Sequence, residues 1–215
     1  MSNQYTASLA ACCSLFCFSS IFSESASAEP VDFRLWFEGP SEVIAGESAT
    51  FQAWAEASGP GLEDAQRDAL ASVTMSILAG GQLGAFDFFD PATHVDNGIL
   101  LIDPGVPNQN TLENIRGFQL MDFNPPGPNR DNPIHMFDFS VQTVLGQFGQ
   151  ISLEAVDTTI WGTVQIIWEI NGTNVASDDP GNSLTIDPFS FQVIPAPGAA
   201  ALLALAGLGT TRRRR

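Results

Sequence analysis

The 215-residue sequence predicts an all-β protein, a β-sandwich of about nine strands with one short helix. Apolar and polar residues alternate along several segments, which is typical of strands with one buried face. The alternation is clear at Val31–Glu38 and at Ala49–Ala55, and Gly and Pro residues separate such segments. A helical period occurs only at Leu62–Leu70, so a jelly-roll or immunoglobulin-like topology is expected.

The remaining strands are expected further along the chain, at Val73–Ile77, Phe86–Phe88, Ile99–Ile102, Phe118–Leu120, Phe137–Thr143, Ile151–Ala155, Ile160–Ile170, Leu184–Ile186 and Phe189–Val193. The cleanest alternation is the one in Ile160–Ile170. Asn171–Gly172 follows it directly and predicts a two-residue hairpin turn, because both positions of such a turn need a left-handed backbone.

Charge excludes one large class of function. The chain has no lysine, and between Glu29 and Ile194 it has 23 acidic residues against four arginines, a formal charge of −19. Such a surface repels nucleic acid and anionic membranes, so we expect no nucleic-acid partner. Simple solvation of an acidic surface explains the charge equally well.

The N-terminal 28 residues have the features of a secretory signal peptide. Ala7–Phe22 is apolar, and Ala26 and Ala28 form a small-x-small site at which signal peptidase is expected to cut. All three cysteines precede that site, so the mature chain would contain no disulfide. Leu9–Cys12 resembles a lipoprotein lipobox, which leaves lipidation as an alternative. Residues 29–194 then form a single exported domain.

Residues 195–215 form a three-part tail. Pro195, Ala196 and Pro197 break regular structure, an apolar run follows, and four arginines that favour the cytoplasmic side end it: Arg212, Arg213, Arg214 and Arg215. The run predicts a single transmembrane helix. From Gly198 to Thr211 that helix would rise only about 21 Å, against about 30 Å of hydrocarbon. A temporary inner-membrane anchor is therefore expected.

The tail resembles the PEP-CTERM sorting signal of bacteria that secrete exopolysaccharide. The resemblance implies an exosortase as processing partner, followed by transfer of the exported protein to the cell surface or the extracellular space. Pro195 and Pro197 match the family's motif, whereas Ala196 stands where the family has glutamate. An ordinary tail anchor is the alternative.

The body loosely resembles cohesin-like sandwiches of bacterial surface proteins. The segments that carry the resemblance are Gly46–Phe51, Phe137–Val141 and Ile151–Leu153. It implies a non-catalytic structural or adhesive domain, associated with exopolysaccharide or with surface proteins. A secreted glycoside hydrolase that uses paired carboxylates on extracellular polysaccharide is the alternative function.

Few residues suggest chemistry, and we expect no catalytic residue and no organic cofactor. His94 and His135 are the only histidines, and no Gly-x-Ser-x-Gly, His-Glu-x-x-His or Cys-x-x-Cys motif is present. Calcium is the one candidate cofactor, because it takes clustered carboxylate and carbonyl oxygens. Its weak candidate ligands fall in two groups, Asp178, Asp179 and Asn182, and Asp87, Asp90 and Asp96. Solvated turns explain both groups as well.

Overall fold

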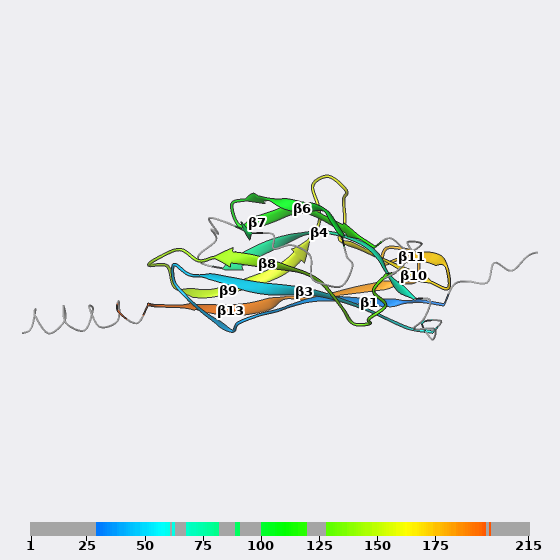
Figure 1. Ribbon diagram of the computed structural model, residues 1–215, viewed down its shortest axis with the longest axis horizontal. Coiled ribbons are helices and arrows are strands. Elements are labelled where there is room, and N and C mark those ends of the chain that lie inside the picture. The colour runs from blue at the N-terminus through cyan, green and yellow to red at the C-terminus, as the bar shows by residue number, and fades with distance from the viewer. Residues whose placement is uncertain are drawn as a thin grey trace, which may run out of the picture.

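The computed structural model describes residues 29–60, 62, 68–81, 89–90, 100–119, 128–196 and 198. The regular structure in these ranges is almost entirely β-strand. The strands form two sheets, and the buried apolar residues lie between them (Figure 1). This arrangement confirms the all-β sandwich expected from the alternating pattern.

The smaller sheet, called sheet A here, has five strands in the order β12-β1-β3-β8-β5. β1 runs parallel to β12 and antiparallel to β3, and β3 is antiparallel to β8. The bounds are Ser183–Asp187 for β12, Asp32–Glu38 for β1, Ser48–Ser58 for β3, Ile134–Gln142 for β8 and Phe89–Asp90 for β5.

The larger sheet, sheet B, has the strand order β11-β10-β4-β9-β13-β2, with β7 on the other edge of β4 and β6 beyond β7. β4 pairs with β10 along its first half and with β9 along its second. The bounds are Thr173–Ala176 for β11, Gln165–Ile170 for β10, Ala69–Gly81 for β4, Gly149–Val156 for β9, Phe189–Ile194 for β13, Glu42–Ile44 for β2, Thr111–Phe118 for β7 and Leu100–Asn108 for β6.

The core is built from alternate residues of both sheets. In β1, Phe33, Leu35 and Phe37 are at most 3% exposed, while the residues between them face outward. Phe51 of sheet A packs on Phe191 of sheet B with ring centroids 4.9 Å apart. Such a pair adds about 0.5–1.5 kcal/mol to the gain from burial alone. The core of the described residues extends from Val31 to Val193.

A bulge in β7 redirects one polar side chain. β7 pairs with β4 in a register that shifts between Met75 and Ile77. Asn114 lies at this shift with a φ of 61°, a left-handed conformation that asparagine tolerates better than most residues. Its backbone N–H donates to Ser76 Oγ at 3.1 Å, and its side chain points away from the β4–β7 ladder to a neighbouring loop. Bulges of this kind recur beside functional sites.

Four expected strands match β1, β9, β12 and β13 within two residues at each end. The expected strands at 49–55, 73–77, 99–102 and 137–143 overlap β3, β4, β6 and β8 but stop at least three residues short at one end or both, and the one at 118–120 shares only Phe118 with β7. The hairpin turn is confirmed. Asn171 and Gly172 connect β10 to β11 with φ values of 51° and 79°. The expected helix at Leu62–Leu70 is wrong at its C-terminal end, because Ala69 and Leu70 are buried at the start of β4. Its residues 63–67, and the expected strand at 86–88, lie outside the described residues.

The strand expected to begin at Ile160 begins instead at Gln165. Ile160 fits the apolar phase of the sequence, but it is 66% exposed in a turn. Thr158 and Gly162 form an isolated bridge across this turn, and Gly162 has a φ of 87°. The chain therefore reverses before it enters β10.

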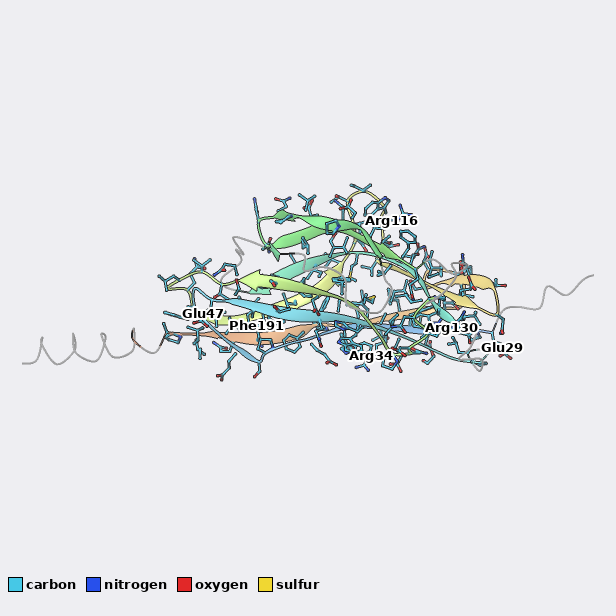
Figure 2. The ribbon with its side chains drawn as sticks, in the orientation of Figure 1. Glu29, Arg34, Glu47, Arg116, Arg130 and Phe191 are labelled. Carbon is cyan, nitrogen blue, oxygen red and sulfur yellow. The ribbon has the colours of Figure 1, made fainter. Side chains whose placement is uncertain are left out.

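Both ends of the sandwich lead toward segments outside the described residues. Glu29 lies toward one end of the molecule, and Phe191 of the last strand lies toward the other (Figure 2). The described part of the chain contains no helix long and apolar enough to cross a bilayer. The expected signal peptide, with Ala26 and Ala28, and the expected sorting helix lie beyond that part.

Candidate binding groove

A groove crosses the outward face of sheet B where three strands lie side by side. The pairing registers place Gln165 of β10 opposite Thr74 of β4, and Thr74 opposite Arg116 of β7. These three outward side chains therefore form one row perpendicular to the strands. Arg116 lies on one side of the molecule in Figure 2, and Arg34 of sheet A lies on the other.

The groove has a volume of about 200 Å³. Its lining combines hydroxyls, an amide, a carboxylate, a guanidinium and an indole, from Ser72, Thr74, Gln165, Asp178, Arg116 and Trp161. Gln165 Nε2 donates to Asp178 Oδ1 at 2.7 Å, which fixes the amide and the carboxylate relative to each other. Donors and acceptors of several kinds thus converge on one small volume, as in ligand sites that read polar groups.

The wall of the groove is the loop between β9 and β10, residues 157–164. The loop presents Ile160 and Trp161 to solvent, 66% and 37% exposed. Thr158 closes the loop, because its N–H and its hydroxyl both donate to the Gly162 carbonyl, at 2.6 and 2.9 Å. At the end of the loop, the Val164 N–H donates to Asp157 Oδ1 at 3.1 Å. Two exposed apolar side chains are therefore held on an ordered backbone.

The side chain of Asn114 in β7 holds the 157–164 loop on sheet B through hydrogen bonds. Its Oδ1 accepts the backbone N–H groups of Thr159 and Ile160 at 2.9 and 3.1 Å, and its Nδ2 donates to Thr159 Oγ1 at 2.9 Å. Asn114 is 6% exposed, so water does not compete freely for these bonds. The bulge in β7 and the exposed Trp161 are thus parts of one arrangement.

Arg116 completes the groove electrostatically. Its guanidinium carbon lies 5.6 Å from the centroid of the Trp161 ring, within the range of a cation–π contact. Its charge and that of Asp178 balance within the groove, although the body as a whole is strongly acidic. The groove is accordingly a neutral, mixed polar and aromatic site on an acidic protein.

The first group of calcium candidates is brought close together, but each side chain has its own hydrogen-bond partner. Asp179 Oδ2 accepts the Ala176 N–H at 2.7 Å, and Asn182 Oδ1 accepts the Val31 N–H at 2.9 Å. Asp178 faces the groove through its bond to Gln165. Where the chain is described, no group of three or more His, Cys, Asp or Glu side chains is placed to hold a metal.

The structure describes only one residue of the second group of calcium candidates, so it does not test whether that group comes together. Asp90 belongs to β5 and pairs with Ser140 of β8, whereas Asp87 and Asp96 lie outside the described residues, as does His94. Calcium binding stays a prediction for both groups. Of the sorting motif, Pro195 and Ala196 follow β13, while Pro197 and the four terminal arginines lie beyond the described part.

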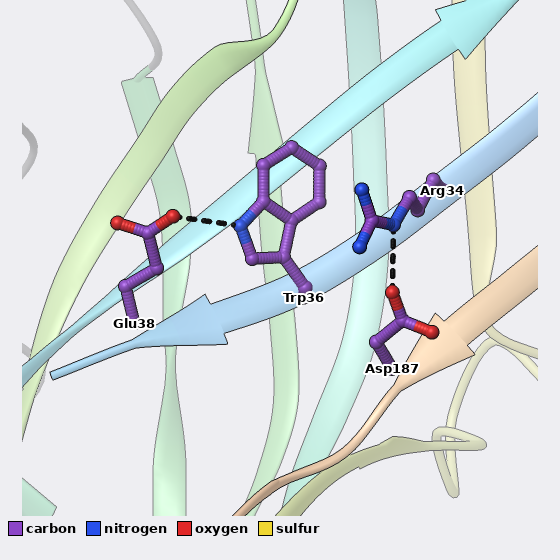
Figure 3. Close-up of polar contacts among 4 residues, drawn as sticks. All are labelled: Arg34, Trp36, Glu38 and Asp187. Atoms are coloured by element: carbon purple, nitrogen blue, oxygen red, sulfur yellow. Dashed lines mark hydrogen bonds and ion pairs between the residues drawn. The ribbon is translucent and has the colours of Figure 1, made fainter. Parts of the chain in front are cut away.

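Sheet A carries a second aromatic cluster on its outward face. The Trp36 and Trp54 rings lie 6.1 Å apart at 13°, and the Trp54 and His135 rings lie 4.7 Å apart at 17°. Trp36 Nε1 donates to Glu38 Oε1, and Arg34 pairs with Asp187 (Figure 3). The rings stack on one another across β1, β3 and β8, so this row stabilises neighbouring strands.

His135 lies in β8 and belongs to this cluster. A bulge between β3 and β8 places it opposite Trp54 instead of in the core. Its Nε2 lies 2.9 Å from Asp138 Oδ1, on the same face of β8. This carboxylate is its one side-chain hydrogen-bond partner among the described residues, so no hydroxyl nucleophile is paired with His135 there.

Sequence reasoning missed Trp161, Arg116 and Asn114 as site residues. The available signal was Asp157-Thr158-Thr159 together with Gly162, a turn-forming set that flanks two apolar residues. The contact between Asn114 and Thr159 joins residues 45 positions apart, and no local pattern reveals it.

Comparison with known proteins gives a likeness of fold only. No family model matches the chain, and no curated protein matches it. The seventh ScaB type I cohesin from Pseudobacteroides cellulosolvens aligns with a TM-score of 0.46 and 8% identity, over 78% of this chain and 94% of that one. The second type II cohesin module of the ScaA scaffoldin of Acetivibrio cellulolyticus aligns at 0.39 and 8%, over 80% and 96%. Likeness at this level says nothing about what this chain binds.

Proposed function

We propose that the protein is an exported, non-catalytic adhesion domain of the cell surface or extracellular matrix, and that it binds its ligand in the groove of sheet B. The observation that carries this proposal is the loop at residues 157–164. Exposing Ile160 and Trp161 to water costs the stability that their burial would give. The loop is nevertheless held by a set of specific hydrogen bonds, which is how a binding surface is preorganised.

The chemistry of the groove favours binding over hydrolysis. A glycosidase of the usual kind needs two carboxyl groups on either side of the scissile bond. The described lining of the groove contributes one carboxylate, that of Asp178, and it already accepts a hydrogen bond from Gln165. The hydrolase alternative therefore receives no support from this site.

The route to the surface is supported by the two ends of the sequence. A signal peptide ending at Ala28 would export the domain, and an exosortase would process the tail at Pro195-Ala196-Pro197. The sandwich leaves β13 immediately before this motif, so cleavage there would release an intact domain. Transient anchoring in the inner membrane would precede release.

The test is retention of the purified chain on extracellular matrix from the producing cells. We expect saturable retention that falls about thirtyfold or more in Trp161→Ala, the loss typical of a central aromatic contact. Phe148→Ala is the matched control, because it truncates an aromatic residue of similar exposure, 42%, that does not line the groove. Release of reducing ends in proportion to protein concentration would contradict the proposal and favour the hydrolase.

A further inference from the structure

We infer that the ligand of the groove is a neutral saccharide segment rich in hydroxyl groups. This inference rests on the proposed function and names the class of ligand that the groove takes. It is carried by three features of the described residues: the unpaired polar groups of the lining, the exposed indole beside them, and the balance of charge.

The lining offers both donors and acceptors that no protein group uses. The hydroxyls of Ser72, Thr74 and Thr163 line the groove and have no hydrogen-bond partner among the described residues. A hydroxyl both donates and accepts, so these groups pair with the hydroxyls of a sugar in either sense. A ligand without hydrogen-bonding groups would displace water from the hydroxyls of the lining and leave them unpaired, which costs free energy.

Gln165 and Asp178 add a planar pair with fixed geometry. The bond between Gln165 Nε2 and Asp178 Oδ1 occupies one atom of each group. The amide oxygen of Gln165 and the second carboxylate oxygen of Asp178 have no hydrogen-bond partner among the described residues and remain as acceptors in the lining. Each of these oxygens can accept a hydrogen bond from a sugar hydroxyl, whose hydrogen rotates to suit its partner.

Trp161 supplies the apolar contact that sugars also need. The C–H bonds on one side of a pyranose ring are weakly positive, and the face of an indole is negative. Trp161 keeps 37% of its surface exposed, and Arg116 contacts its ring. Arg116 has no ion-pair partner among the described residues, so its N–H groups remain available to sugar oxygens.

The size and charge of the groove further restrict the class of ligand that it can bind. A volume of about 200 Å³ is below the roughly 300–1,000 Å³ of pockets that enclose whole ligands. The groove would therefore hold one or two units of a longer chain. A body charge of −19 repels acidic polysaccharides at a distance, whereas a neutral chain meets no such barrier.

The experiment is affinity electrophoresis of the full chain in mild detergent, with gels containing galactomannan, xyloglucan or alginate. We expect retardation by at least one of the two neutral polymers, little change with added salt, and no retardation by alginate. Trp161→Ala should weaken the binding about thirtyfold or more, and Trp161→Phe should recover part of it. Leu145→Ala and Phe148→Ala, which truncate exposed apolar residues outside the groove, should leave the binding unchanged.

The outcomes separate this inference from the proposed function. Binding to neutral polymers that persists in Trp161→Ala overturns the inference, and so does retardation by alginate alone. If neither neutral polymer binds but retention on matrix still depends on Trp161, the saccharide class is wrong while the adhesive function stands. If retention on matrix is absent as well, both fail. Circular dichroism of each variant establishes that the sandwich is intact.

Discussion

The hydrogen bonds of Asn114 allow a quantitative prediction about the binding loop. Asn114→Gly removes the side chain but tolerates the φ of 61°, so it isolates the contribution of the side-chain bonds. Four bonds are lost: Oδ1 no longer accepts two backbone N–H groups and the Thr159 hydroxyl, and Nδ2 no longer donates to Thr159 Oγ1. Each is worth about 0.5–1.5 kcal/mol net.

We therefore expect Asn114→Gly to lower the free energy of unfolding by about 2–6 kcal/mol, the sum of four such bonds. Asn114→Ala should cost about 0.5–1 kcal/mol more, because left-handed strain of about 1–2 kcal/mol outweighs the smaller unfolded-state entropy of alanine. Asn114→Asp keeps the acceptor for both N–H groups and loses only the donor. Its cost should be about one bond or less.

Urea unfolding followed by circular dichroism measures these differences, and native-state hydrogen exchange locates them. In Asn114→Gly the amides of Thr159 and Ile160 should exchange much faster, while the amide of Ala79, which donates to the Asn110 carbonyl, should be unaffected. The reasoning is refuted if Asn114→Gly changes stability by less than about 0.5 kcal/mol and leaves both loop amides protected.

Three further predictions concern the core, calcium and the tail. Trp168→Ala should cost about 3–5 kcal/mol in urea unfolding, because the indole is 1% exposed; Trp168→Phe should cost much less, because the buried indole N–H has no partner to lose. A specific calcium site would make millimolar calcium raise the melting temperature beyond a NaCl control of equal ionic strength, and Asp178→Asn with Asp179→Asn would abolish that excess if the site lies there; equal melting temperatures would leave only charge screening. A reporter that carries Phe189–Arg215 should reach the membrane and be cut at its Pro-Ala-Pro motif in an exosortase-bearing host. Deletion of Arg212–Arg215 should mislocalise it, and an uncut tail on surface protein would contradict sorting.

The strands could be predicted from the sequence because each buries one face. Phe33, Leu35 and Phe37 alternate with exposed residues, and that period survives in the sequence whatever the strand pairs with. The same rule placed Trp36 on the polar face, where the structure shows it stacked on Trp54. The alternating period does not specify which strands pair with each other. The order of the strands in the two sheets therefore could not be predicted from the sequence.

The binding groove could not be predicted, because its parts are distant in the sequence. Ile160 has the phase of a strand residue, but a bridge between Thr158 and Gly162 turns it outward. Arg116 and Gln165 become neighbours only through their shared pairing with Thr74. The end of the expected helix failed for a related reason, since tertiary pairing made Ala69 and Leu70 part of β4 against their helical spacing.

The central claim is that ligand binds on the outward face of sheet B, and amide chemical-shift mapping tests it most directly. On titration with the neutral polysaccharide that retards the chain, the account predicts shifts confined to Trp161, Thr163, Gln165 and their neighbours on β4 and β7, and to the indole N–H of Trp161. Shifts that cluster instead around Trp36 and Trp54 on sheet A would contradict it.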